Sequence, residues 1–305
     1  MVRRAQNIRV QSSDGAQCTN GPGTPRREYG MAKRPEVKTW GDTAFLRMAV
    51  EGLLDAKKAR TSAGNRAKRG GVADVYQQDA LIAPAIALEG AYEKMLIDAY
   101  RQTVPTVIQE WAAGIPGLAS GTLFPSIIAL IGDPRRAVPY HWVPGKEVGS
   151  KEVRVLVADG EPYDRSVRQL WQWCGCGDPM IAPKFVSTKD DQSLKLKMGK
   201  RTTLRPRLYT FTSALQRGSG TPGIAGSRYF KILQDAKADG LTKVHDVQCQ
   251  NKKRPPMSSN GCGTVANPEL GEPGSPWRPG HAQAHSHRIV QKEFLRDLWE
   301  IAGTI

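Results

Sequence analysis

The stretch from Gly114 to Pro134, GIPGLASGTLFPSIIALIGDP, sets an apolar run directly behind a Pro-Gly turn. One interpretation is an ordinary turn followed by a buried helix. In that case four apolar residues at helical spacing face the core, namely Leu123, Ile127, Ile128 and Ile131. This interpretation predicts packing and no chemistry.

The second interpretation is the hairpin of a helix-hairpin-helix. Its glycines let the backbone approach a phosphate, and the N–H groups that open the second helix face the anion. The phosphate-holding positions would be Ile115, Gly117 and Ala119, with Ser120 or Thr122 as the cap of the next helix. A second glycine is common where Ala119 stands, so the stretch alone leaves both interpretations open.

The charge of the whole chain favours a polyanionic partner. Its 305 residues contain 44 Lys and Arg against 29 Asp and Glu, a net charge of +15. A field of that sign attracts nucleic acid first, then an anionic membrane surface or an acidic protein. The absence of an apolar run of membrane-spanning length, the absence of a secretory signal and the odd cysteine count predict a cytoplasmic protein, nucleoid-associated in a bacterium.

Periodicity predicts a mainly α fold. Residues 1–40 are basic and poor in apolar pairs, which indicates a disordered tail, and Met31 is an alternative start to Met1. Residues 41–110 carry helical stripes suited to packing in cis or in a homodimer, around an exposed basic turn at Lys57–Gly71. Residues 111–305 are expected to form a helical DNA-binding domain with two insertions, a small β-hairpin over 145–165 and a long irregular loop over 243–280.

The strongest binding signal is the run KLKMGKRTTLRPRL. It contains six cations and no acid, namely Lys195, Lys197, Lys200, Arg201, Arg205 and Arg207. Apolar residues at Leu204, Leu208, Phe211 and Leu215 would anchor the helix, so that the cations lie on a rigid element. We therefore expect these cations to contact phosphates.

Cysteines and histidines gather between His245 and His287. The spacing is H-x3-C, a second cysteine, and then H-x3-H, in a Gly- and Pro-rich segment. A structural zinc site is one interpretation, with Cys249, Cys262, His281 and His285 as ligands. The other interpretation is a loop with ordinary thiols and a His-rich helix start.

Five segments, taken in order, resemble the C-terminal part of transposases of the insertion-sequence 110/1111 family. They are IPGLASGTLFPSIIALIGDP, SVRQLWQWCGCGDP, GKRTTLRPRLYTFTSAL, SRYFKILQDAKADG and HRIVQKEFLRDLW. The resemblance spans residues 80–300 and implies a DNA-recombining protein in which a serine attacks a phosphodiester. Counting along the family's pattern makes Ser187 the candidate nucleophile and Ser193 the second candidate. Thr188 follows Ser187, where the family commonly has glycine.

The chain also departs from this family. Members carry an N-terminal RuvC-like domain that binds Mg²⁺ through four acids, and the sequence here has no strand pattern for one. Mg²⁺ is then expected as a cofactor only if a separate RuvC-like partner protein supplies its binding site. The resemblance further implies a structured guide-type RNA beside DNA as partner. We thus expect a DNA-binding protein for transposition, truncated or diverged; the alternatives are a non-catalytic DNA- or RNA-binding protein and a zinc-stapled interaction module.

Overall fold

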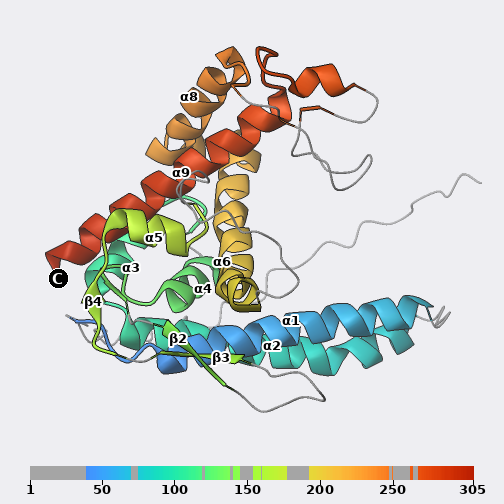
Figure 1. The fold of residues 1–305 in the computed structure, drawn as a ribbon. Helices are drawn as coiled ribbons and strands as arrows, with labels where there is room; N and C mark the ends of the chain where they lie inside the picture. The colour runs from blue at the N-terminus through green and yellow to red at the C-terminus, as the bar shows by residue number, and fades with distance from the viewer. Residues whose placement is uncertain are drawn as a thin grey trace, which may run out of the picture. The chain divides into compact units, whose positions relative to one another are not determined.

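The computed structural model describes residues 39–69, 75–118, 121–137, 140–144, 154–158, 160–176, 192–246, 249, 262–263 and 267–305. Helices dominate this part of the chain (Figure 1), which confirms a mainly α fold. They are α1 (Ala44–Arg69), α2 (Val75–Thr103), α3 (Thr106–Ala113), α4 (Leu123–Ile131), α5 (Val167–Trp173), α6 (Gln192–Arg217), α7 (Pro222–Ala225), α8 (Arg228–Thr242) and α9 (Pro279–Ile301), with 3-10 turns η1 (Pro268–Gly271) and η2 (Ala302–Thr304). The tail predicted over 1–40 lies outside these residues apart from its last two.

Helices α1 and α2 pack side by side in antiparallel orientation (Figure 1). Lys57 reaches Glu93 at 3.3 Å, and Arg60 pairs with Glu89 at 2.5 Å. The contact is close at Gly52, where an added Cβ would lie 2.1 Å from the Tyr92 ring. Helix α2 therefore packs against a helix of the same chain; of its predicted stripe, Tyr92, Met95 and Ala99 lie inward, whereas Leu88 is about half exposed.

The sequence interpretation of α1 was wrong in two respects. The basic run is not a turn, because α1 continues through it to Arg69. Its Ala, Lys and Arg residues have high helix propensity, and the ion pairs to α2 hold the exposed face. The helical stripe expected within residues 41–110 also needs correction in α1, since its members Phe45 and Met48 are about half exposed, while Leu46 and Val50 are fully buried.

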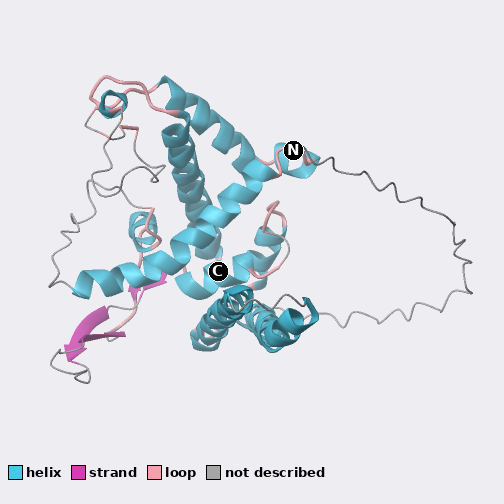
Figure 2. Ribbon diagram, turned by 90° about the vertical axis from the view of Figure 1, so that its right-hand side faces the viewer, coloured by secondary structure: helices cyan, strands magenta, loops and turns pink. Residues whose placement is uncertain are grey.

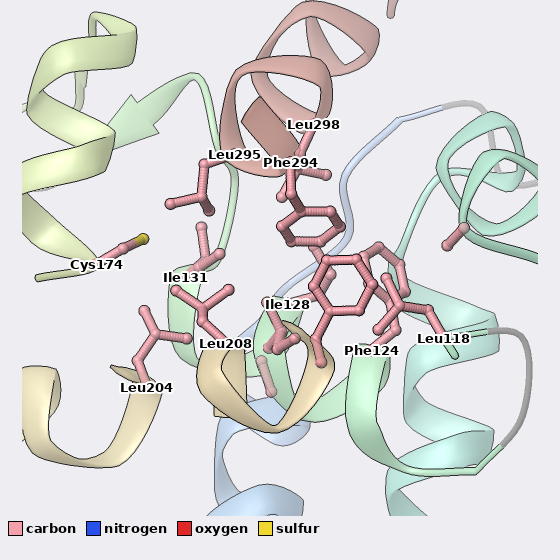
Figure 3. Packing of buried hydrophobic residues seen from close by; sticks show 14 of the residues in the cluster. Leu118, Phe124, Ile128, Ile131, Cys174, Leu204, Leu208, Phe294, Leu295 and Leu298 are labelled. Carbon is pink, nitrogen blue, oxygen red and sulfur yellow. The ribbon is translucent and has the colours of Figure 1, made fainter. Parts of the chain in front are cut away.

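The core lies where α3, α4, α6 and α9 meet (Figure 3). Aromatic rings fill its centre: Trp111 stacks on Phe294 with centroids 5.6 Å apart, and Phe124 and Phe211 lie at 6.3 and 5.0 Å from the same ring. Each buried side chain of this size stabilises the fold by about 1.5–3 kcal/mol. As predicted, the anchors of α6 are all buried, namely Leu204, Leu208, Phe211 and Leu215.

The opening stretch forms a tight connection between α3 and α4. Ile115 and Leu118 are buried, and Gly117 has φ +86°, a conformation that glycine adopts without strain. Thr122 stands at the N-cap of α4 without a side-chain hydrogen bond to the helix. The core role predicted for Ile127, Ile128 and Ile131 is confirmed, since all three are buried.

The β structure differs from the predicted hairpin. Strand β3 (Arg154–Ala158) pairs antiparallel with β2 (Tyr140–Pro144), which precedes it in the chain, and not with a strand that follows Gly160. After Gly160, β4 (Tyr163–Asp164) pairs instead with β1 (Arg136–Ala137). Figure 2 shows how small the strands are beside the helices. The overlooked signal was YHWVP at 140–144, because Tyr, Trp and Val favour strands.

Helices α6 and α9 run antiparallel in a fixed register. His287 Nδ1 lies 2.6 Å from Thr212 Oγ1, and Gln216 Nε2 donates to Gln283 Oε1 at 3.4 Å. Helix α5 joins them through Trp171, whose Nε1 donates to the Lys292 carbonyl at 3.0 Å. Within the described part of the chain, no helix combines the length and apolarity that a membrane crossing requires.

Candidate metal centre and nucleic-acid interface

Four side chains converge between the end of α8 and the start of α9. They are His245, Cys249, Cys262 and His281, and their donor atoms all lie within 4.8 Å of one another. His245 follows α8 by three residues, and His281 lies in the first turn of α9. Residues far apart in sequence thus form one cluster that can hold a metal ion.

Backbone hydrogen bonds bring these residues together. Val244 forms an antiparallel bridge with Pro276, and the His245 N–H donates to the Ser275 carbonyl at 2.9 Å. The Cys249 N–H donates to the Gly271 carbonyl at 2.7 Å. An added Cβ at Gly271 would lie 2.4 Å from the Cys249 carbonyl oxygen, so only glycine allows this approach.

The cluster is compact, with two buried and two partly exposed members. His281 Nδ1 lies 3.4 Å from Cys262 Sγ and 3.7 Å from Cys249 Sγ. Cys262 is 1% exposed and His245 is 4% exposed. The Nε2 atom of His245 is inaccessible to solvent and has no hydrogen-bond partner among the described residues. An unsatisfied buried nitrogen is costly, which a bound metal or another partner would relieve.

The protonation of the cluster follows from burial. Burial raises the pKa of the Cys262 thiol, and the neighbouring Cys249 raises it further against a hydrogen bond from the Arg278 N–H. Burial lowers the pKa of His281, as do the nearby His245 and Arg288. The imidazole is therefore held neutral, the form that binds metals, whereas the thiol loses its proton on binding.

The fourth member of the predicted ligand set needs correction. His285 is not in the cluster; its ring packs edge-on against Trp277, with centroids 5.1 Å apart. His245 takes its place, because the bridge after α8 carries this residue back toward α9. The H-x3-C spacing of His245 and Cys249 was the sequence signal that could have identified it.

The remaining histidine of this region has a structural environment. His287 is 2% exposed, bonded to Thr212 through Nδ1 and to Gln283 through Nε2 at 2.9 Å. Burial lowers its pKa, with a smaller contribution from Lys237. This histidine joins α9 to α6.

The hairpin positions offer the following geometry. The Ile115 N–H donates to the Ala112 carbonyl at 3.1 Å, and its side chain belongs to the core. Gly117 has the left-handed conformation described above, and Ala119 lies outside the described residues. Phosphate binding at this turn stays a prediction.

The basic run lies on α6, which carries its cations, Lys195, Lys197, Lys200, Arg201, Arg205 and Arg207, on one continuous helix. Arg205 is exposed, whereas Arg207 is half-buried, and its Nε and Nη2 atoms have no hydrogen-bond partner within the part of the chain that the structure describes. Burial lowers the pKa of Arg207. Ser193 lies in the first turn of α6, and Ser187 lies outside the described residues.

Comparison with known proteins adds no assignment: no protein-family model, curated protein or solved structure matches this chain.

Proposed function

We propose that this chain is a DNA-binding protein of the transposase kind, with a structural zinc ion holding its C-terminal part. The observation that carries the DNA-binding proposal is α6. This helix is fixed to the core by Leu204, Leu208, Phe211 and Leu215. It bears the run of six cations without an acid, and each cation that meets a phosphate contributes through counterion release.

The donor set supports zinc. Two thiolates and two imidazoles form the combination that structural zinc sites use. Zn–S bonds of about 2.3 Å and Zn–N bonds of about 2.0 Å place sulfur and nitrogen roughly 3.5 Å apart in one tetrahedron. The separations between His281 Nδ1 and the two sulfurs are 3.4 and 3.7 Å. The residues present therefore fit the ion.

The role of such a zinc would be structural. Four protein ligands fill a tetrahedron and leave no position for substrate. The ion would join the segment between α8 and α9, where η1 is the only helical element among the described residues. Removal of the zinc by a chelator should speed up amide hydrogen exchange in this segment, while the amides of α1 and α2 should stay as protected as before. Unchanged protection after complete metal removal would contradict the proposal.

Strand transfer is the catalytic half of the proposal, and it rests on the resemblance. Ser187 would supply the hydroxyl that attacks a DNA phosphodiester: a serine–phosphate ester forms, the bond from phosphorus to one deoxyribose oxygen breaks, and that oxygen leaves as a hydroxyl that takes up the proton lost by the serine. Fixed cations would hold the phosphate. Incubation with DNA from the flanks of the chain's own gene should give a covalent protein–DNA adduct. Ser187→Ala should abolish the adduct and leave binding intact, with Ser193→Ala as the matched variant.

Binding without chemistry is the second candidate. It predicts that no adduct forms on any DNA, while Lys200→Glu with Arg201→Glu weakens binding in a salt-dependent manner. A fluorescence anisotropy titration of labelled duplex DNA at two salt concentrations decides whether the chain binds DNA at all. Affinity that does not depend on salt would contradict both candidates.

A further inference from the structure

A group of cations from two helices gathers beside the end of α5. Cys176 Sγ lies 3.3 Å from Gln291 Oε1, which places Cys176, three residues beyond the last residue of α5, against α9. Arg288 and Lys292 flank Gln291 on α9. On α6, Arg205 follows Leu204, whose side chain packs in the same buried cluster as Cys174 at the end of α5 (Figure 3). The positive charges of Arg205, Arg288 and Lys292 all act on the Cys176 thiol.

Among the described residues, this group has no acid paired with it. None of Arg205, Arg288 and Lys292 forms an ion pair within the portion of the chain described above. The three acids of α9 point to the opposite face: Glu293 and Asp297 bind Arg228 of α8, and Glu300 pairs with Arg296. Three like charges are thus held together while the negative charges are turned away.

The surroundings fix two of these cations in place. Lys292 Nζ lies 5.4 Å from the centre of the Trp171 ring, and the Lys292 carbonyl accepts a hydrogen bond from that indole. Arg288 is half-buried, and its pKa is lowered by burial and then by the charge of Arg205. Positioned cations that repel one another are unfavourable in the unbound protein, and an anion placed among them relieves that repulsion.

We propose that Arg205, Arg288 and Lys292 form a phosphate-binding site for the backbone of duplex DNA. The inference rests on the proposed DNA binding and adds α9 to the interface, with two residues that lie outside the basic run. Arg288 presents a planar guanidinium suited to a phosphate, and Lys292 presents a point charge beside it. The site contacts phosphates and is therefore indifferent to base sequence.

The test compares two triple variants of the full chain with equal loss of charge. One is Arg205→Gln, Arg288→Gln and Lys292→Gln. The control is Lys94→Gln, Arg217→Gln and Lys231→Gln, three exposed cations on other helix faces. Anisotropy of a labelled mixed-sequence duplex is followed between about 50 and 200 mM salt. The quantity compared is the steepness with which the logarithm of the binding constant falls with the logarithm of the salt concentration, here called the salt slope. The cluster variant should lower the salt slope by about 2–3 and the control by less than about 1.

Thermal melting guards against a folding defect. Because the three charges repel one another, the cluster variant should melt at or above the wild-type temperature, and DNA should stabilise it less than the wild type. Arg205→Gln alone alters an exposed side chain and should still lower the slope by about 1. Equal effects of the two triple variants would overturn the inference while DNA binding stands. A wild-type chain that does not bind DNA would overturn both.

Discussion

His281 Nδ1 lies 3.4 Å from Cys262 Sγ, and this contact joins the first turn of α9 to the segment that follows α8. Cys249 and His245 complete the cluster from the other end of that segment. The same helix α9 contacts α6 through His287 and carries Arg288 and Lys292 beside Arg205. Order at the metal site and placement of the basic surface thus depend on one helix.

Gly271→Ala should weaken the metal site without touching a ligand. Its Cβ would meet the Cys249 carbonyl oxygen at 2.4 Å, so the backbone that positions Cys249 must move. We expect a lower melting temperature and at least about tenfold weaker zinc binding, of the size seen for changes around metal ligands. Gly90→Ala is the matched control, because nothing lies within 4 Å of its Cβ. Equal zinc affinity in the two variants would contradict this role of Gly271.

Gly52→Ala should loosen the pairing of α1 and α2. The new methyl group would overlap the Tyr92 ring, so the ring or the helix must shift. Overpacking of this kind typically costs about 1–3 kcal/mol, which exceeds the helix propensity gained by replacing glycine. Denaturant unfolding measures the change. A variant with the same free energy of unfolding as the wild type would contradict the prediction, since the Tyr92 ring could then move aside without loss of stability.

Phe294→Ala should be among the most destabilising single changes. This ring is fully buried and contacts Trp111, Phe124 and Phe211, which belong to three other helices. Large-to-small changes at such positions cost about 3–5 kcal/mol. Ile301→Ala, at a partly buried position of the same helix, should cost less. The free energies of unfolding of the two variants provide the comparison.

His287 should make stability fall on acidification. Burial lowers its pKa below the ordinary value, so the unfolded chain binds a proton that the folded chain does not. This contribution is fully present above about pH 6.5, the ordinary value, and is lost as the pH falls below it. His287→Gln should lower stability at neutral pH and reduce the loss between about pH 7 and 5. A pH dependence identical to the wild type would contradict this assignment.

The sequence predicted those helices in which apolar residues recur at helical spacing over several turns and in which capping residues or glycines mark the ends. Helix α6 buries the expected leucines and phenylalanine, and α5 begins at the Ser166–Gln169 capping box and ends before Gly175, with φ +76°. Local spacing could not predict pairings made at a distance. The partner of β3 and the metal ligand His245 both depend on how the chain returns to an earlier element. Exposure of Phe45 likewise depends on where α2 packs.

The zinc content of the purified chain, measured by native mass spectrometry with two histidine variants in parallel, decides whether this cluster binds the ion. We expect one zinc ion per wild-type chain, retention of that ion in His285→Asn and its loss in His245→Asn, since His245 and not His285 belongs to the cluster. A wild-type chain that binds no zinc, or variants with the opposite behaviour, would contradict this expectation.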